Sequence, residues 1–160
     1  MYTAYLLIGG NLGDRFANLQ RSIELIEECC GDIISISSVY ETAAWGVTDQ
    51  PSFLNQVVVL NTEMKPEVLM EKLLEIELQM GRIRTEKMGP RTIDIDILLI
   101  DDLCIKSHHL TVPHPSLPLR KFALIPLAEV AGSRIHPAEN KTISELLTDC
   151  PDTLTVTKIS

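Results

Sequence analysis

The chain has 160 residues, of which 45% are hydrophobic, and it carries a formal net charge of -8 at pH 7. This length and apolar content are sufficient to bury one substantial core, so we expect a single domain over residues 1–160. The acidic balance disfavours a nucleic-acid or anionic-membrane surface, because both reward a broad basic patch. A phosphate ligand would therefore need local arginines and a metal ion.

The cysteines indicate a reducing compartment. None of the four belongs to a C-x-x-C pair, and Cys29 and Cys30 are sequence neighbours, which rarely suit a structural disulfide. We therefore expect reduced thiols and a cytoplasmic protein. The first apolar run, at residues 4–8, is too short for a signal peptide and lacks a basic leader, and no segment approaches the length of a membrane span.

The N-terminal part predicts a strand, a turn and a helix. Residues 2–8 are typical of a buried strand, and Gly9, Gly10 and Gly13 are expected to form a tight turn. Asp14 is expected to cap a helix that ends at Gly31. The segment GGNLGD lacks both G-x-G-x-x-G and the G-K-[ST] ending of a phosphate-binding loop, which favours a structural turn.

The following elements complete a recognisable order. Residues 33–42 and 53–60 are predicted strands with a loop between them, and Pro66 suits the first turn of a second helix that ends before Gly81. Residues 92–101 form the next predicted strand. The order strand, helix, strand, strand, helix, strand is that of a ferredoxin-like βαββαβ α+β domain, with one antiparallel sheet covered by two helices.

The C-terminal part has a weaker pattern. Residues 107–120 are interrupted by prolines and predict a loop, and residues 121–131 predict a short helix. We therefore expect the core to carry a C-terminal extension of loop and helix.

The most informative segment is GPRTIDIDILLI, which begins at Gly89. Alternate side chains of a strand share a face, so Asp94 and Asp96 should point the same way and Ile95 the other. With α-carbons roughly 7 Å apart and an effective dielectric of about 20, the two carboxylates would repel by about 2 kcal/mol. A divalent cation such as Mg²⁺, bound by both carboxylates, turns this repulsion into a net attraction. The alternative for a bare D-x-D is a solvated strand face.

Basic residues near the two aspartates suit a phosphate ligand. Arg82, Arg84 and Arg91 precede them, and a guanidinium group donates paired hydrogen bonds to phosphate oxygens. Arginines beyond a helix end can equally be solvated or neutralise the helix dipole. His114 lies between two prolines that restrict its backbone, as a binding group requires, although a lone loop histidine is more often a surface residue.

Other candidates are weaker. Glu77 could support the arginines or the metal, although a solvated helix face is the simpler reading. The rings of Trp45, Phe53 and Phe122 could stack on a heterocycle, while Phe53 and Phe122 could equally belong to the core. We assign no role to the remaining histidines, which are His108, His109 and His136.

Six segments follow one another in an order that is typical of one enzyme family: GGNLGDR, YET, DQPSFLNQVV, IELQMGRIR, GPRTIDIDILL and LTVPHPSLPLRKFALIPL. Together they resemble the 6-hydroxymethyl-7,8-dihydropterin pyrophosphokinase family, nearly end to end. The resemblance implies a ferredoxin-like kinase of folate biosynthesis that transfers the pyrophosphoryl group of MgATP to the pterin's hydroxymethyl oxygen and releases AMP. It implies small-molecule substrates and no nucleic acid, membrane or obligate protein partner.

The resemblance also implies roles for matching positions. Asp94 and Asp96 would hold two Mg²⁺ ions that bridge the ATP phosphates. Arg82 and Arg91 would neutralise charge in the transition state. Further contacts with ATP are expected from Arg84, Ile97, His114, Arg120 and Glu77. Contacts with the pterin are expected from Thr42, Ala44, Trp45, Gly46, Phe53, Asn55 and Phe122.

The chain departs from the family pattern at two places. Many members have Thr-Pro-Pro where this chain has Thr42, Ala43 and Ala44, and many have a tryptophan where it has Met88. We expect residues 43–52 and 83–91 to be movable covers of the site, and the first departure to loosen its cover.

Two other functions fit parts of the pattern. Nucleotide-sugar transferases also use D-x-D to hold a metal-bound diphosphate, but they usually need a larger nucleotide-binding domain. A non-catalytic ligand-binding module on the same fold would bind without turnover and would not need Asp94 and Asp96.

Overall fold

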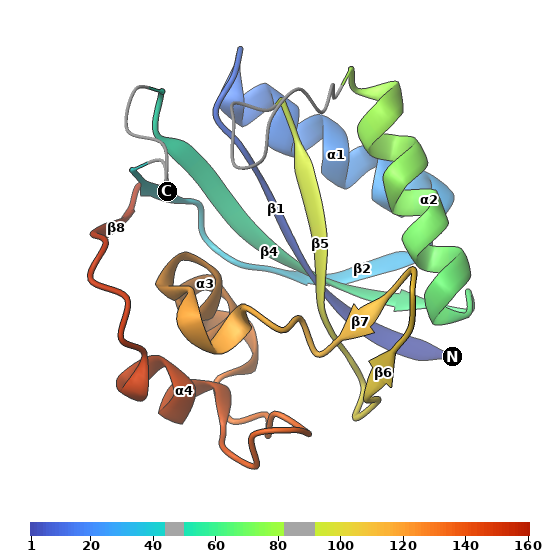
Figure 1. The fold of residues 1–160 in the computed structure, drawn as a ribbon. Helices are drawn as coiled ribbons and strands as arrows, with labels where there is room; N and C mark the ends of the chain where they lie inside the picture. Colours follow the sequence, from blue (N-terminus) through green and yellow to red (C-terminus); the bar gives the residue numbers. More distant parts are fainter. Residues whose placement is uncertain (44–49, 82–91) are drawn as a thin grey trace.

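The computed structural model describes residues 1–43, 50–81 and 92–160, and Figure 1 shows the arrangement of its elements. The first part contains β1 (Tyr2–Gly10), α1 (Arg15–Cys29), β2 (Asp32–Ile36), β3 (Tyr40–Thr42), β4 (Phe53–Thr62) and α2 (Pro66–Gln79). The second part contains β5 (Asp94–Ile100), β6 (Ile105–Lys106), β7 (Thr111–Val112), the 3-10 helix η1 (Leu117–Leu119), α3 (Lys121–Ala131), α4 (Ile143–Asp149) and β8 (Val156–Lys158).

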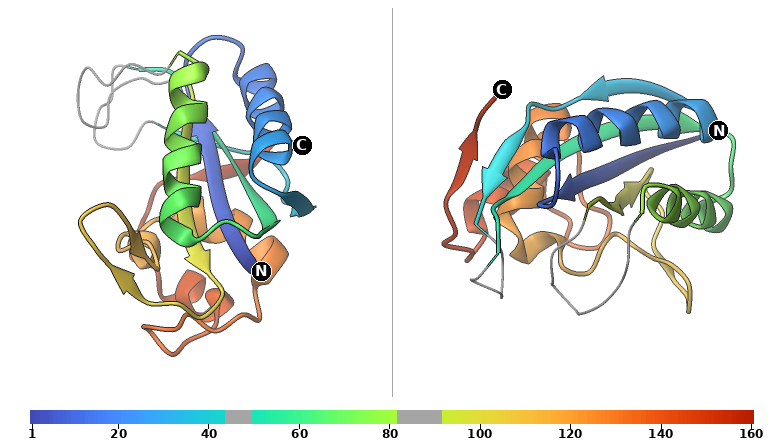
Figure 2. Two further views of the ribbon diagram at one scale, coloured as in Figure 1. Left: turned by 90° about the vertical axis from the view of Figure 1, so that its right-hand side faces the viewer. Right: turned by 90° about the horizontal axis from the view of Figure 1, so that it is seen from above.

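The main sheet of the described residues has the strand order β5-β1-β4-β3-β8, and β2 also pairs with β4. Each of these pairings is antiparallel. Figure 2 shows β8 lying alongside β3 at one edge of the sheet. Apart from the added β8, this is the strand order of a ferredoxin-like sheet, so the predicted α+β fold is confirmed.

The predicted strand at residues 33–42 is two strands, because Ser37 interrupts it. The buried Ser37 hydroxyl accepts a hydrogen bond from the Val57 N–H at 2.9 Å, and the Ser37 N–H donates to the Val57 carbonyl at 2.9 Å. A side chain thus replaces a backbone acceptor of the ladder at this point. β2 and β3 consequently lie one after the other along β4.

The prediction of a glycine turn was partly wrong. Gly9 and Gly10 continue β1 as strand residues, and only Gly13 adopts a left-handed conformation, with φ of 68°. Asp14 caps α1 as predicted, because its carboxylate accepts a hydrogen bond from the Ala17 N–H at 3.1 Å. The turn before the helix is therefore shorter than the sequence suggested.

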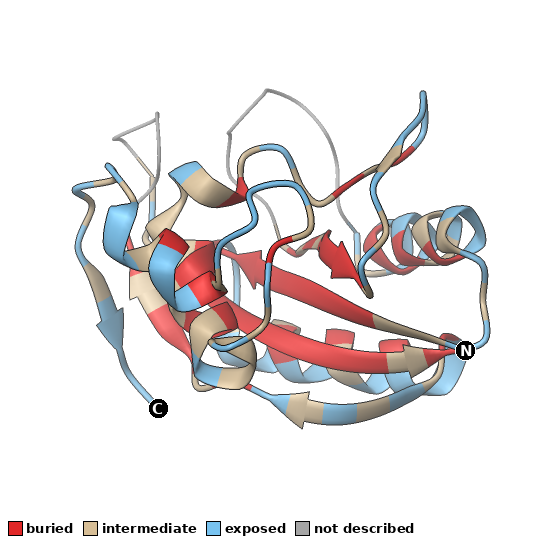
Figure 3. Cartoon of the chain, turned by 90° about the horizontal axis from the view of Figure 1, so that it is seen from below, coloured by how far each residue is buried: buried red, intermediate tan, exposed pale blue. Residues whose placement is uncertain are grey.

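Helices cover both faces of the sheet: α1 and α2 lie on one, and α3 and α4, from the C-terminal extension, lie on the other. Along β1, Leu6 and Ile8 belong to the core beneath α1 and α2, whereas Tyr5 and Leu7 belong to the core beneath α3 and α4. This alternation requires the central strands to be apolar on both sides. Figure 3 shows the result, since buried residues run along most of β1 and β4.

Helix α3 is fixed to the sheet by a carboxylate. The Glu129 side chain accepts hydrogen bonds from the Tyr40 hydroxyl at 2.6 Å and from the Ser38 N–H at 2.9 Å. Burial and the hydrogen bond with Glu129 raise the pKa of Tyr40 to about 12, so this hydroxyl stays protonated and remains a donor. The N-terminal end of α3 is held by Asp152, which accepts from the Lys121 N–H at 3.0 Å.

All four cysteines lie in described residues and are free thiols, as predicted. In the described part of the chain, no helix combines the length and the apolar content needed to cross a membrane. The expectation of a single domain over all 160 residues stays a prediction.

His136, to which the sequence assigned no role, is buried and makes the stability of the fold depend on pH. Its Nδ1 accepts hydrogen bonds from the N–H groups of Ala138 and Glu139 at 3.1 and 3.0 Å. Burial lowers the pKa of His136 below its ordinary value. As pH falls below about 6.5, the unfolded chain therefore takes up a proton that the folded chain does not, and the free energy of unfolding falls.

We predict that His136→Asn flattens this pH dependence, because asparagine keeps an acceptor but does not titrate. The measurement is urea unfolding at a series of pH values between 5 and 8. Burial also lowers the pKa of His114, so a smaller slope of the same sign should remain. The exposed His108→Asn is the control, and an unchanged slope in His136→Asn contradicts the prediction.

Candidate active site

The acidic strand β5 presents its two carboxylates on one face, as predicted. Ile93, Ile95 and Ile97 are at most 3% exposed, whereas Asp94 and Asp96 between them are half-buried. The three isoleucines pack in the core with α1 and α2. The aspartates are therefore directed to the opposite face, where both line a cavity.

Glu77 holds the backbone between these two aspartates. β5 is an edge strand, and the Ile95 N–H donates to the Glu77 carboxylate at 2.7 Å. Glu77 is only 3% exposed, so the alternative of a solvated helix face is wrong. This buried side-chain acceptor on an amide of the edge strand fixes β5 at the place where its acidic side chains need a constant spacing.

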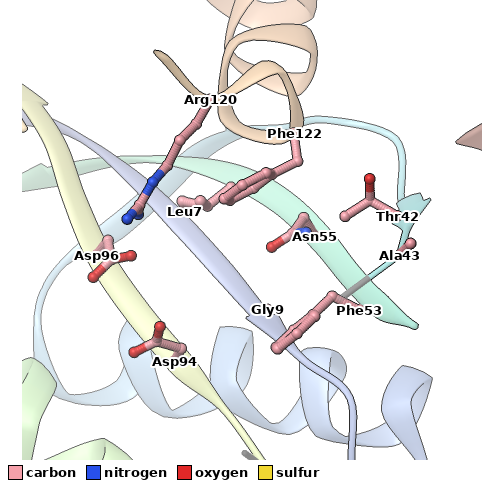
Figure 4. Close-up of a pocket in the computed structure, with 10 residues that line it drawn as sticks. All are labelled: Leu7, Gly9, Thr42, Ala43, Phe53, Asn55, Asp94, Asp96, Arg120 and Phe122. Atoms are coloured by element: carbon pink, nitrogen blue, oxygen red, sulfur yellow. The ribbon is translucent and has the colours of Figure 1, made fainter. Parts of the chain in front are cut away.

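The cavity that contains the aspartates encloses about 580 Å³ of space, part of which is open to solvent. Figure 4 shows Asp94 and Asp96 at one side of it, Thr42 and Ala43 at the other, and Phe53 and Phe122 on either side of Asn55. The lining residues come from all four strands β1, β3, β4 and β5 and from the start of α3: Leu7, Gly9, Thr42, Ala43, Phe53, Asn55, Asp94, Asp96, Arg120 and Phe122.

A glycine allows Asn55 to reach the cavity floor. A Cβ atom at position 9 would overlap with the Asn55 side-chain oxygen and would lie 2.8 Å from the Leu54 carbonyl oxygen. Because Gly9 and Asn55 are paired across β1 and β4, the absence of a side chain on one strand makes room for the amide on the other. Asn55 is 6% exposed and brings both a donor and an acceptor to the site.

Phe53 and Phe122 are half-buried and line the cavity, which makes them more than core residues. The Arg120 guanidinium lies 5.7 Å from the centre of the Phe122 ring, and Figure 4 shows it extending toward Asp96. Two flat rings beside a buried amide suit a planar heterocycle, and a cation near the carboxylates suits a phosphate. The two halves of the cavity thus favour different chemistry.

A second cavity of about 460 Å³, part of which is open to solvent, adjoins the acidic strand. It shares Asp96 with the first cavity, and its remaining lining residues are Met70, Ile97, His109, Leu110, Thr111, His114 and Pro115. A ligand that occupied this cavity and extended along β5 would pass the two aspartates on its way to the first cavity.

His114 is placed in the second cavity by the backbone of β5. Its N–H donates to the Leu98 carbonyl at 2.9 Å, and its Nδ1 accepts from the Ser116 N–H at 3.1 Å. Burial and the neighbouring Arg120 lower the pKa of His114, against a smaller opposing effect of Asp94. At neutral pH the ring is therefore neutral, with its proton on Nε2 as a hydrogen-bond donor.

Several predicted site residues lie outside the described residues. These are Arg82, Arg84, Arg91, Ala44, Trp45 and Gly46, together with most of the two predicted cover segments and Met88. Thr42 lines the first cavity, but its hydroxyl donates to the Thr155 carbonyl at 2.9 Å. Thr42 therefore has a structural hydrogen bond in addition to its place in the cavity wall.

The sequence interpretation missed some lining residues. His109 had been assigned no role, yet it lines the second cavity with Leu110, Thr111 and Met70. Leu7 and Gly9 could have been found from strand alternation, because they share a face of β1 with Tyr5. No comparable signal marks His109, since its position depends on how the β6–β7 hairpin folds back.

The carboxylates of Asp94 and Asp96 suit a hard divalent cation that takes its other ligands from a bound phosphate and water. Within residues 1–43, 50–81 and 92–160, no group of three or more His, Cys, Asp or Glu side chains forms a metal cluster. Two carboxylates on one strand leave most coordination positions to phosphate oxygens and water, which is how proteins usually bind Mg²⁺ with nucleotides.

Comparisons with known sequences agree with this chemistry. A family model described as 7,8-dihydro-6-hydroxymethylpterin-pyrophosphokinase (HPPK) matches residues 5–132. The 2-amino-4-hydroxy-6-hydroxymethyldihydropteridine pyrophosphokinase of Aquifex aeolicus is 43% identical over 145 residues, which cover 91% of this chain and 90% of that protein. The protein of the same name from Synechocystis is 40% identical over 89% of this chain and 74% of its own length.

Solved structures show the same fold at low sequence identity. Wild-type Plasmodium falciparum HPPK-DHPS superposes with a TM-score of 0.72 at 18% identity, over 92% of this chain and 43% of that chain. An HPPK-DHPS crystallised in complex with substrates gives 0.75 at 16% identity, again over 92% of this chain and 43% of the other. This chain thus spans less than half the length of those proteins.

The fold, the cavities and the family match define the class of protein: the chain is a pyrophosphokinase. It belongs to the 7,8-dihydro-6-hydroxymethylpterin-pyrophosphokinase family, in agreement with the resemblance seen in the sequence.

The hydrogen bond between Glu77 and Ile95 gives a prediction for stability. Glu77→Leu leaves the buried Ile95 N–H without this acceptor and should lower the free energy of unfolding by about 1–3 kcal/mol, whereas Glu77→Gln, which keeps an oxygen, should cost less. Chemical denaturation measures both. Glu75→Leu on the exposed side of the same helix is the control, and a Glu77→Leu protein as stable as wild type would refute the assignment.

Proposed function

We propose that this chain transfers the pyrophosphoryl group of MgATP to the hydroxymethyl oxygen of 6-hydroxymethyl-7,8-dihydropterin, giving AMP and the pterin diphosphate, as a step of folate biosynthesis. The observation that carries the proposal is that Asp94 and Asp96 both line the first cavity and that Asp96 also lines a second cavity of different chemistry. Family membership supports the same reaction.

The first cavity suits the pterin. Its Phe53 and Phe122 rings offer flat apolar surfaces to a bicyclic heterocycle, and the buried Asn55 amide offers a donor and an acceptor to the heteroatoms of its edge. In this arrangement the pterin's hydroxymethyl group is directed toward the carboxylates. Backbone groups at Thr42 and the residues Ala44, Trp45 and Gly46 complete the proposed pterin contacts.

The second cavity suits the nucleoside part of ATP. Met70, Ile97 and Leu110 give it apolar walls, and the neutral His114 supplies an N–H donor for a phosphate oxygen. The triphosphate then runs along β5 past Asp96 toward the pterin. This path places the bond that must break next to the oxygen that attacks, which is the main requirement of phosphoryl-type transfer.

We propose that Asp94 and Asp96 hold two Mg²⁺ ions, with the remaining ligands supplied by ATP and water. When bound, the ions would offset the negative charge of the triphosphate and polarise the reacting oxygens. The protein's own part is to keep the two carboxylates on one face and at a fixed spacing. Glu77 would serve the ATP side indirectly, through the Ile95 N–H.

Arginines would complete the charge balance. Arg120 extends toward the carboxylate side of the first cavity, where its positive charge would offset that of a phosphate bound near the two aspartates. For Arg84 we propose a contact with the triphosphate, and for Arg82 and Arg91 neutralisation of the charge that shifts in the transition state. A guanidinium group suits this task because it stays charged at any working pH.

The two alternatives from the sequence are less favoured. A nucleotide-sugar transferase does not account for the family match, and a non-catalytic module does not account for two half-buried carboxylates on one face of the site. We further propose that the protein acts in the cytoplasm, on small-molecule substrates and without an obligate protein partner.

A direct assay tests the proposal. Incubation with MgATP and the reduced pterin alcohol should produce AMP and pterin diphosphate in equal amounts, and omission of the pterin should prevent AMP formation. Separation of the nucleotides by chromatography measures both. AMP formed equally without the pterin, or ADP formed in place of AMP, would contradict the proposed reaction.

Asp96→Asn should abolish most of this activity. The substitution keeps the shape of the side chain but removes the charge, and we expect turnover to fall by about 10²-fold or more, as when a charge-stabilising group is lost from an active site. The control is Asp32→Asn on the exposed β2, which should retain full activity. Circular dichroism checks that both variants are folded.

A further inference from the structure

We infer that Arg15 is a positioning residue for the pterin side of the site, which rests on the proposed function. Arg15 is the first residue of α1 and lies in the GGNLGDR segment, for which the sequence indicated only a structural turn. It lines neither cavity. Its effect on the reaction would be exerted through residues of the cavity wall.

One guanidinium nitrogen of Arg15 joins the ends of two strands. Its Nη1 donates to the Glu41 carboxylate at 2.7 Å and to the Ser52 carbonyl at 3.1 Å. Glu41 is the middle residue of β3, and Ser52 directly precedes β4. The contact therefore bridges the place where the chain leaves β3 and the place where it enters β4.

The bridged residues are immediate neighbours of the cavity wall. Thr42 follows Glu41 and Phe53 follows Ser52, and these two wall residues pair with each other across β3 and β4. Since a peptide unit has little freedom beyond two torsion angles, fixing Glu41 and Ser52 restricts where the Phe53 ring and the Thr42 backbone can lie.

The same segment makes a second attachment beside the first. The Asn11 amide donates to the Gln50 side-chain oxygen and to the Pro51 carbonyl, each at 2.9 Å, and Asn11 is 2% exposed. Residues 50–52 are thus held by Asn11, in the segment that links β1 to α1, and by Arg15, the first residue of α1. This attachment supports the position of the segment before β4. The Arg15 contact joins that segment to β3 through Glu41.

The Arg15–Glu41 ion pair is partly exposed to solvent, which limits its contribution to fold stability. The Arg15 and Glu41 side chains are 29% and 36% exposed, and solvent screening leaves such a pair with little effect on unfolding. A contact that contributes little to stability but fixes two wall residues is best understood through its effect on ligand geometry.

The test compares Arg15→Met with Arg21→Met, a substitution of the same kind on the exposed side of α1. Arg15→Met should weaken binding of the pterin by about tenfold, the effect of losing about 1.4 kcal/mol of interaction. Binding is measured by titrating the pterin alcohol in the presence of a non-hydrolysable MgATP analogue. Affinity for that analogue alone should stay within about twofold of wild type, since its cavity is not attached to Arg15.

Two further readouts separate positioning from a structural role. Arg15→Lys should recover part of the pterin affinity, because an ammonium group can still donate to Glu41 but is carried on a shorter side chain. The melting temperatures of the variants should match that of wild type. Pterin affinity unchanged in Arg15→Met, or an equal loss for both ligands with a lower melting temperature, overturns the inference.

Failure of the inference and failure of the proposed function give different results. A wild-type protein that produces no pterin-dependent AMP contradicts the proposed reaction and this inference together. A wild-type protein that does so, with an Arg15→Met variant of normal pterin affinity, contradicts the inference alone.

Discussion

The site depends on one constraint, the two-residue period of an extended strand. It places Asp94 and Asp96 on one face of β5 while the isoleucines between and around them pack in the core. A shift of register by one residue would bury both charges, which the core could not accommodate. The apolar face of β5 thus fixes the acidic face, and burial energy is what keeps two like charges adjacent.

Three sets of contacts to the backbone of β5 hold the acidic strand in this position. β1 pairs with it on one side, Glu77 accepts from the Ile95 N–H on the other, and the Leu98 carbonyl accepts from His114 beyond the aspartates. The residues on these contacts come from distant parts of the chain. The result is an acidic edge strand with its backbone held on both sides and with Asp96 lining both cavities.

An acidic enzyme that binds a polyphosphate needs local charge compensation. The chain carries a formal net charge of -8, so a general electrostatic attraction for ATP is absent. Arg120 and the proposed Mg²⁺ ions supply positive charge at the site itself, and the neutral state of His114 offers a donor without a further charge. Specificity for ATP then depends on the shape of the site and on the positions of a few charged and hydrogen-bonding groups.

The sequence predicted those elements whose local signals agree with their packing. The apolar period and Pro66 defined α2, and the alternation around Asp94 defined β5 and its acidic face. It did not predict the particular roles of Ser37, Gly9 and His109 that involve partners distant in sequence. Ser37 replaces a ladder acceptor of Val57, Gly9 makes room for Asn55, and His109 lines a cavity with Met70 of α2. Arg15 escaped notice because its partners are also distant in sequence.

The most direct test of this account is a crystal structure of the complex with Mg²⁺, a non-hydrolysable ATP analogue and the pterin alcohol. The account predicts that carboxylate oxygens of both Asp94 and Asp96 coordinate Mg²⁺ ions that also contact the phosphates, with the pterin between Phe53 and Phe122. Bound nucleotide and pterin with neither aspartate in contact with a metal ion would contradict it.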